Sequence, residues 1–225
     1  MRCQMLVCIL DKEPKALYQE IKRLTLTEAG VLSQCLQFNH LRREIKDQYA
    51  ANVAMKVNVK LGGATNTVSN LPLMERPTML VGADVTHPSP GSLTPSIAAI
   101  VTSMDKNATR YNTFLRAQPP RVEIIEDMEA VVGEGLDRLR ASINIYPERI
   151  IFFRDGVASG QFAEVRAKEV TAIKRALYNR GLQDKCKVLV VVVQKRHHIR
   201  LFPMDRSQSD RSGNCLPGTV VCFLF

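Results

Sequence analysis

Two aspartates stand in apolar stretches of the sequence, where packing explains a charged side chain poorly. Asp84 lies within the stretch 81–85, and Asp155 follows the stretch 149–153. If the two stretches form neighbouring strands, the carboxylates come close together, and at roughly 4 Å two such charges repel by about 4 kcal/mol at an effective dielectric constant near 20. A divalent cation relieves this repulsion, and Mg²⁺ prefers carboxylate and water oxygens. Asp84 and Asp155 therefore predict a site for Mg²⁺, or for Mn²⁺ in its place.

The chemistry that such a metal site supports is phosphodiester cleavage. Two ions about 3.5–4 Å apart can hold the attacking and the leaving oxygen of an in-line displacement. A purely structural interpretation also accounts for the residues: Asp84 caps a turn, and Asp155 forms a common turn dipeptide with Gly156. The residue types by themselves leave both interpretations open.

A second group of residues has the composition of an anion site. Tyr18 and Lys22 lie four residues apart, as do Lys56 and Lys60, and this spacing places each pair on one face of a helix. Together with the amide of Gln34, the ammonium groups suit a terminal phosphate, which carries roughly two negative charges. The phenol suits stacking on a base. Ordinary solvated lysines are the alternative interpretation.

The charge balance of the whole chain favours a polyanionic partner. Lys and Arg number 31 against 22 Asp and Glu, which gives a net charge of +9. Nucleic acid is the commonest polyanion that such a chain attracts. The sequence has no apolar run of about 18 residues, so we expect no membrane partner. The six cysteines form no CxxC pair and indicate free thiols in a reducing compartment. We expect a cytoplasmic protein that can also be present in the nucleus.

Basic residues also follow the last long apolar stretch. Lys195, Arg196 and Arg200 are placed to line a channel for a nucleic-acid backbone, whose phosphates position a strand without reading its sequence. His197 and His198 resemble a metal-binding pair. Adjacent residues in an extended chain point apart, so we interpret both histidines as structural.

The periodicity of apolar residues predicts the elements that position these groups. In the first part of the chain we expect strands and helices before a polar linker at 66–77 that contains prolines: strands 5–10 and 31–38, a helix beginning at Pro14 and a helix over 41–54. In the second part the pattern predicts, in order, strands 78–85, 96–104 and 111–117, a helix with an apolar face from Ile124, strand 149–153, helix 161–180 and strand 187–194. This is the element order of an RNase H-like core, so the predicted fold class is α/β with a mixed sheet.

Several ordered motifs resemble those of eukaryotic Argonautes. The resemblance to their PIWI domain is carried by residues 81–88, 95–99, 153–162 and 194–198, and residues 18–63 resemble the MID domain. Only the C-terminal tail of the chain departs from the family. The resemblance implies a partial Rossmann-like MID domain at 1–65, the linker 66–77 and an RNase H-like PIWI core at 78–225. It also implies a small guide RNA with a 5′ phosphate, a complementary target RNA and, as further partners, proteins of the silencing complex.

Roles for single residues follow from the matched motifs. Asp84 and Asp155 fall on two of the four residues that hold metal in target-cleaving Argonautes, and Glu123 matches the family's mobile glutamate. Spacing alone does not separate Glu123 from three nearby acidic residues: Glu126, Asp127 and Glu129. Tyr18, Lys22, Gln34, Lys56 and Lys60 all match the pocket for the guide's 5′ phosphate and first base. Lys195 and Arg196 match residues that contact the guide backbone.

The resemblance also raises an expectation about activity. The family's fourth catalytic residue, His or Asp, has no counterpart in this sequence, and neither do the family's N-terminal and PAZ domains. From the resemblance we expect the parent protein to be a guide-directed endoribonuclease. Because the fourth residue is missing, we expect the chain as written not to cleave RNA at a useful rate. One alternative is a truncated gene product without a stable fold. Another is an unrelated RNase H-like nuclease, which would leave Tyr18, Lys22 and Lys56 unexplained.

Overall fold

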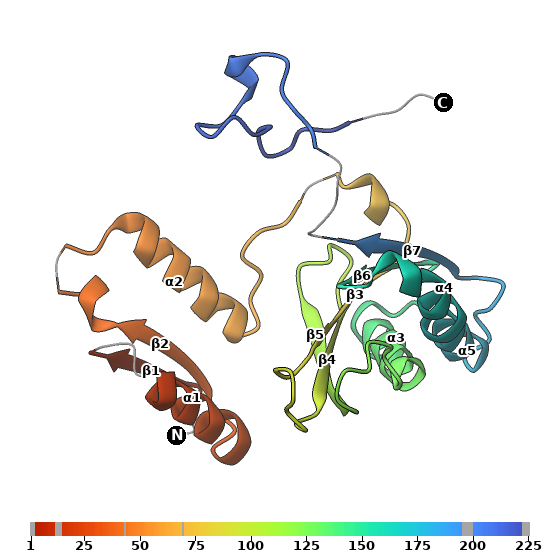
Figure 1. The fold of residues 1–225 in the computed structure, drawn as a ribbon, viewed down its shortest axis with the longest axis horizontal. Helices are drawn as coiled ribbons and strands as arrows, with labels where there is room; N and C mark the ends of the chain where they lie inside the picture. Colours follow the sequence, from red (N-terminus) through yellow and green to blue (C-terminus); the bar gives the residue numbers. More distant parts are fainter. Residues whose placement is uncertain (1–2, 12–14, 43, 69, 195–199, 222–225) are drawn as a thin grey trace.

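A computed structural model describes residues 3–11, 15–42, 44–68, 70–194 and 200–221 of the chain. Within these residues the strands form two separate sheets, one of two strands and one of five (Figure 1). No helix among them is long and apolar enough to cross a membrane. The two sheets correspond to the two parts that the sequence predicts, whereas the boundaries at 66 and 77 stay predictions.

The larger sheet is mixed, as predicted. Its strands are β3 (Thr78–Thr86), β4 (Ser96–Ser103), β5 (Tyr111–Gln118), β6 (Arg149–Asp155) and β7 (Lys187–Val193). They are ordered β5-β4-β3-β6-β7. The first three pair antiparallel through short connections, and β3, β6 and β7 pair in parallel. The strands that carry the two aspartates, β3 and β6, are therefore central neighbours.

Helices make the crossovers that parallel strands require. One of them, α3 (Met128–Ile143), leads to β6, and α4 (Phe162–Val165), the π-helical turn η5 (Arg166–Val170) and α5 (Thr171–Tyr178) lead to β7. In Figure 1, α3 and α5 lie side by side against the sheet. Val131, Leu136 and Ile173 on these helices are fully buried against Met79 and Ile100 of the sheet. This core fixes the sheet that carries the acidic residues.

Two predicted helices have different bounds in the structure. The predicted helix from Ile124 begins only at Met128, because the backbone of residues 123 and 125 is bonded to the buried side chains of Arg154 and Glu169. The helix predicted over 41–54 is α2 (Asp47–Lys60). A short 3-10 helix, η2 (Phe38–His40), precedes α2. Asp47 lies in the first turn of α2, where the helix dipole favours a negative charge.

The smaller sheet pairs β1 (Met5–Leu10) with β2 (Leu32–Gln37) in parallel. Between them run α1 (Lys15–Arg23) and the π-helical turn η1 (Leu24–Glu28). Three further 3-10 helices complete the described elements: η3 (Pro72–Met74), η4 (Ser159–Gln161) and η6 (Arg206–Gln208). Side chains from α1 and α2 both reach β2, so this strand is the place where the predicted anion site can assemble.

Candidate functional site

The structure places Asp84 and Asp155 at the same end of neighbouring strands. Ala83 of β3 is in register with Arg154 of β6, and the two aspartates are the next residues along each strand. The Oδ1 atom of Asp84 accepts the N–H of Val85 at 2.9 Å, and Oδ1 of Asp155 accepts the N–H of Gly156 at 2.8 Å. Asp84 is exposed and Asp155 is half-buried, so water and ions can reach this strand end.

Gly156 shows that a third carboxylate faces the same space. Its φ is +83°, and a Cβ atom added to it would lie 3.3 Å from Oδ1 of Asp84 and 3.8 Å from Oε1 of Glu123. Asp84 and Glu123 thus approach the same backbone position from different segments. A larger residue at 156 would adopt a strained backbone conformation and crowd Asp84. The glycine therefore keeps the acidic strand end open.

Glu123 is held in this position from two sides. Arg154 donates through Nη2 to Oε1 of Glu123 at 2.9 Å and to its backbone carbonyl at 2.6 Å. On the other side, Nε2 of His87 lies 2.7 Å from Oε2 of Glu123, and Nδ1 of His87 lies 2.8 Å from Oγ of Ser96. Ser96 Oγ accepts the N–H of Arg121, which leaves its own hydrogen for Nδ1 of His87. This arrangement favours a hydrogen on Nε2 that is donated to Glu123.

Arg154 is the buried centre of this network. Its side chain and that of Glu169 are both 0% exposed, and Arg154 Nε donates to Oε2 of Glu169 at 3.1 Å. Glu169 also accepts the N–H of Ile125 at 2.9 Å. Burial raises the pKa of Glu169, and the hydrogen bond from Ile125 and the charge of Arg154 oppose that rise. One guanidinium thus serves two carboxylates and fixes the segment that carries Glu123.

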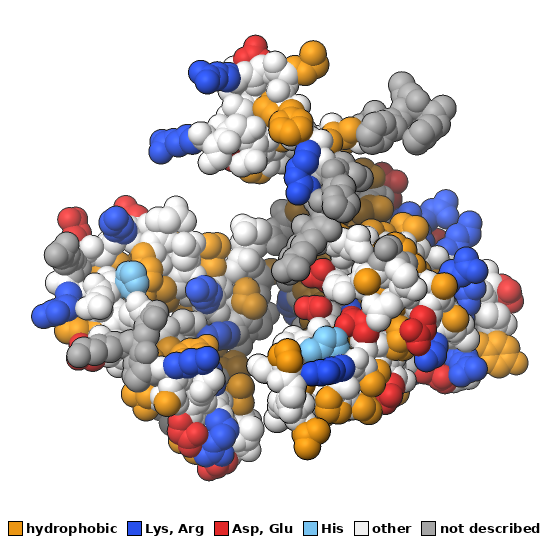
Figure 2. All heavy atoms as spheres, viewed as in Figure 1, with side chains coloured by type: hydrophobic (Ala, Val, Ile, Leu, Met, Phe, Trp, Pro, Cys, Tyr) orange, Lys and Arg blue, Asp and Glu red, His pale blue; other side chains and the backbone are white. Residues whose placement is uncertain are grey.

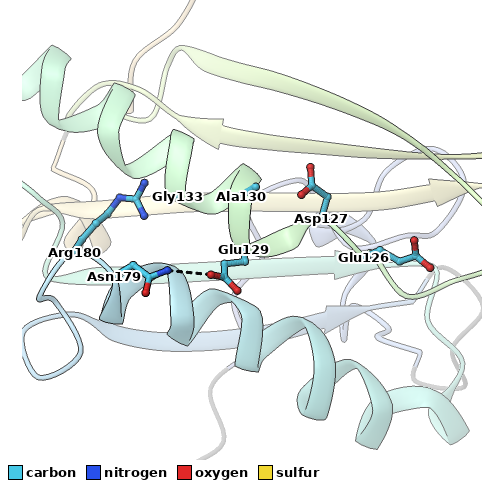
Figure 3. A pocket seen from close by; sticks show the side chains of 7 residues that line it. All are labelled: Glu126, Asp127, Glu129, Ala130, Gly133, Asn179 and Arg180. Atoms are coloured by element: carbon cyan, nitrogen blue, oxygen red, sulfur yellow. Dashed lines mark hydrogen bonds between the residues drawn. The ribbon is translucent and has the colours of Figure 1, made fainter.

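The three acidic residues near Glu123 lie at a different place on the surface. Glu126, Asp127 and Glu129 line a pocket of about 380 Å³ together with Asn179 and Arg180, as Figure 3 shows. Glu129 accepts a hydrogen bond from Asn179 at 3.0 Å. Asp127 pairs with Arg116 of β5. Of the four candidates, Glu123 is the one whose carboxylate lies beside Gly156, as that of Asp84 does.

The acidic strand end fits a hard divalent cation through two carboxylates. Asp84 and Asp155 supply the oxygen ligands that Mg²⁺ prefers, and this ion usually keeps several waters. The carboxylate of Glu123 is bonded to Arg154 and His87. Among the described residues, no three His, Cys, Asp or Glu side chains are grouped so that they could hold a metal ion. The arrangement therefore offers two ligands and a nearby third carboxylate that is bonded to other side chains.

The predicted anion site assembles on β2. Lys22 donates through Nζ to the backbone carbonyl of Ser33 at 2.7 Å and to its Oγ at 2.9 Å. Lys60 donates to the same carbonyl at 2.7 Å and to Oε1 of Gln34 at 2.7 Å. Two ammonium groups therefore share one neutral oxygen. Helices α1 and α2 bring them together from residues 38 positions apart in the sequence.

The electrostatics of this cluster favour an added anion. The pKa of Lys60 is lowered by burial and then by the neighbouring charges of Lys22 and Lys56. The ring of Tyr18 lies beside the cluster, with its centroid 5.8 Å from Nζ of Lys22, and Tyr18 is 46% exposed. The structure thus gathers the predicted residues at one place. A negative charge there would relieve the repulsion between the ammonium groups.

Several contributors to these sites were not predicted from the sequence, among them His87, Arg154 and Ser33. A charged residue inside the apolar strand β6 was the available signal for Arg154. No comparable signal marks Ser33, whose backbone carbonyl and hydroxyl both accept from Lys22. On the part of the molecule that carries the larger sheet, Figure 2 shows acidic side chains beside a histidine. On the N-terminal part it shows separate Lys and Arg side chains.

The predicted backbone channel is described only in part. Lys195 and Arg196 lie outside the described residues, as do His197 and His198. Arg200 is described and exposed. The role of all three basic residues in contacting a nucleic-acid backbone stays a prediction.

Comparison with known proteins places this arrangement in a family. A family model described as the Piwi domain matches residues 5–222. Protein argonaute 18 of Oryza sativa subsp. japonica is 43% identical over 221 residues, which are 94% of this chain and 20% of that protein. The argonaute of Schizosaccharomyces pombe is 43% identical over 215 residues, 95% of this chain and 26% of that protein. The chain belongs to the Argonaute family.

Solved structures agree with this assignment. The structure of Kluyveromyces polysporus Argonaute with a guide RNA superimposes on 94% of this chain with a TM-score of 0.81 and 28% identity, and the match covers 26% of that chain. The MID-PIWI domains of QDE-2 from N. crassa match 84% of this chain with a TM-score of 0.74 and 29% identity, and 55% of that chain is covered. The chain spans 20% of the Oryza sativa relative and 26% of the Schizosaccharomyces pombe relative. The comparisons confirm the α/β fold with its mixed sheet.

Proposed function

We propose that this chain binds the 5′-phosphorylated end of a small guide RNA at the cluster on β2. The observation that carries the proposal is the convergence of Lys22 and Lys60 on the single carbonyl of Ser33. A terminal phosphate has three acceptor oxygens and roughly two negative charges, so it can accept from both ammonium groups at once. A solved relative carries a guide RNA, which supports this ligand class.

The remaining residues of the cluster suit the rest of a nucleotide end. Gln34 presents an amide whose oxygen accepts from Lys60 and whose Nε2 donates to the backbone of Cys35 at 2.8 Å. The half-exposed ring of Tyr18 offers a face for stacking the first base. Lys56 adds a further positive charge at the border of the cluster. Together these groups favour a phosphate with a base attached over a free inorganic anion.

The proposal is tested by comparing two RNAs that differ only at the 5′ end. We expect a 5′-phosphorylated RNA to bind at least about tenfold more tightly than its 5′-hydroxyl twin, because each charge-assisted hydrogen bond contributes about 1.5–3 kcal/mol. Fluorescence anisotropy at fixed salt measures both affinities. Lys185→Gln serves as a control that removes one positive charge away from the cluster. Lys185 is exposed and precedes β7 of the larger sheet, so this change should leave the preference intact. Equal affinities in a folded sample would refute the assignment.

A second function concerns the larger sheet. We propose that residues 78–225 form an RNase H-like PIWI core, that 1–65 are part of a Rossmann-like MID domain and that 66–77 link them. In the whole protein, the complementary target RNA would then lie across the end of β3 and β6. Within RNA-mediated silencing, proteins of the silencing complex are further partners. The neighbouring carboxylates of Asp84 and Asp155, with Glu123 facing them across Gly156, support a centre for target cleavage.

In that centre this chain's residues would position a metal and a third carboxylate. Asp84 and Asp155 would hold Mg²⁺ or Mn²⁺, which supplies electrostatic stabilisation to the phosphate oxygens of the scissile bond. Arg154 and His87 orient the carboxylate of Glu123 beside them. Calorimetric titration with Mn²⁺ tests the assignment without requiring cleavage. We expect binding that Asp84→Asn weakens at least about tenfold, as loss of one charged ligand implies, whereas Glu164→Gln on α4 leaves it unchanged. Equal binding in all three proteins would contradict the site.

A further inference from the structure

Two cysteines face each other beside the anion site. Cys8 of β1 and Cys35 of β2 are register partners in the parallel pair. Partners in register on parallel strands point to the same side of the sheet and lie about 4.8 Å apart. That separation falls inside the range of about 4.4–6.8 Å between the Cα atoms of disulfide-bonded residues. Both cysteines are free and half-buried, so a small oxidant can reach them.

Cys35 is also part of the floor of the anion site. Its backbone carbonyl accepts the amide Nε2 of Gln34 at 2.8 Å. Its thiol lies near the ammonium groups of Lys22 and Lys60 and within hydrogen-bonding contact of Cys8. Burial raises the pKa of the Cys35 thiol, and the two lysine charges oppose this rise in part. Any movement of Cys35 is therefore transmitted to residues that hold the lysines in place.

We propose that Cys8 and Cys35 form a reversible disulfide when they meet a peroxide, and that this bond weakens the anion site. One sulfur attacks a peroxide oxygen, the O–O bond breaks, and water leaves, which converts that cysteine to a sulfenic acid. The second sulfur then attacks the first, the S–O bond breaks, and hydroxide takes the second thiol's proton and leaves as water. Two thiols and one hydrogen peroxide thus give one disulfide and two waters. A low-molecular-weight thiol reverses the reaction by exchange.

The link between oxidation and binding is geometric. A separation of about 4.8 Å lies near the short end of the disulfide range, whose commonest values are about 5.5–6 Å, so forming the bond favours a shift of Cys35 relative to β1. This movement displaces Gln34 and the Ser33 carbonyl that Lys22 and Lys60 share. Binding groups need to be held within about 0.5 Å of their productive positions. This second part of the inference rests on the proposed function of the cluster, whereas the formation of the disulfide does not.

The disulfide is tested on the full chain without RNA. The protein is treated with hydrogen peroxide, free thiols are alkylated, and peptides are mapped by mass spectrometry without reduction. We expect a peptide pair that joins Cys8 to Cys35, is two hydrogens lighter than the reduced pair and disappears after treatment with dithiothreitol. Cys8→Ser should abolish the pair, and Cys215→Ser should not. Oxidation of Cys35 to a sulfinic acid, or cross-links that involve other cysteines instead, would overturn the proposal.

The effect on binding is measured with the same samples. We expect oxidation of the wild-type chain to reduce its preference for a 5′-phosphorylated RNA by about fivefold or more, which corresponds to the loss of one hydrogen bond. The preference of Cys8→Ser should not change on oxidation. If the disulfide forms and the preference persists, the switch is refuted. If the reduced chain shows no preference at all, the proposed guide-binding function fails, and the peptide map still decides whether the disulfide forms.

Discussion

Replacing Arg154 by methionine tests the network that positions Glu123. The arginine is fully buried and donates to both oxygens of Glu169, to the backbone carbonyls of Glu123 and Asp155 and to the Glu123 carboxylate. Methionine fills similar space but leaves two carboxylates without their cation. Removing one partner of a buried ion pair costs about 3–5 kcal/mol, so we expect Arg154→Met to lower the free energy of unfolding by that amount.

The pH dependence of this loss follows from Glu169. Its pKa is raised by burial even with Arg154 present. A group whose pKa rises on folding contributes stability that is fully present below its unfolded pKa and is lost as the pH rises through its folded pKa. Without Arg154 the pKa of Glu169 rises further. The destabilisation should therefore be smaller at about pH 5 than at about pH 7.5, because the neutral acid needs no cation.

Urea unfolding at the two pH values measures the effect. Glu169→Gln keeps an oxygen for the N–H of Ile125, so the double variant Arg154→Met/Glu169→Gln should recover more than about 1 kcal/mol relative to Arg154→Met. Lys168→Met breaks the exposed pair with Glu164 and should cost less than about 1 kcal/mol. A cost for Arg154→Met as small as that of Lys168→Met, or one that Glu169→Gln does not change, would refute the reasoning.

Three further predictions concern Gly156, the core and the basic residues that follow β7 in the sequence. Gly156→Ala should destabilise the chain by about 1–2 kcal/mol, because its φ of +83° strains any side chain, and should weaken Mn²⁺ binding in calorimetry by crowding Asp84. Leu136→Ala should cost about 2–5 kcal/mol in urea unfolding, since Leu136 is fully buried, and a cost below about 1 kcal/mol would contradict the described core. Lys195→Ala and Arg196→Ala should each reduce the slope of log affinity against log salt by about 0.7 for single-stranded RNA of any sequence, and an effect confined to particular sequences would contradict a backbone contact.

The order of elements was predictable because strands and helices differ in the period of their apolar residues. Apolar runs such as that in β7 indicate strands directly, although β7 lies at the edge of the sheet and its residues are half-buried or exposed. Asp84 and Asp155 stand out because they interrupt or end such runs. The adjacency of the two aspartates followed once β3 and β6 were neighbours. The sequence did not indicate that the helix after Pro120 begins at Met128, because contacts from Arg154 and Glu169 hold the preceding residues outside the helix.

The choice among acidic residues also depended on tertiary contacts. Glu126 and Glu129 have the same chemistry as Glu123 and lie within six residues of it, so only the positions of Gly156 and Arg154 separate them. At the anion site, the backbone carbonyl of Ser33 accepts from both lysines, and a backbone acceptor has no distinguishing pattern in the sequence. The pairing of Cys8 with Cys35 likewise depends on the strand register.

The central claim is that lysines from α1 and α2 form one site for the 5′ phosphate of a guide RNA. The most direct measurement combines changes on both molecules: the affinity of 5′-phosphorylated and 5′-hydroxyl RNA for the wild type, for Lys22→Gln/Lys60→Gln and for the control Lys185→Gln/Lys187→Gln, at one salt concentration. Because both lysines contact the shared acceptor, the account predicts that the first double variant loses the phosphate preference and that the control, with the same change in charge, keeps it. An equal preference in the two double variants would show that the phosphate binds elsewhere and would contradict the account.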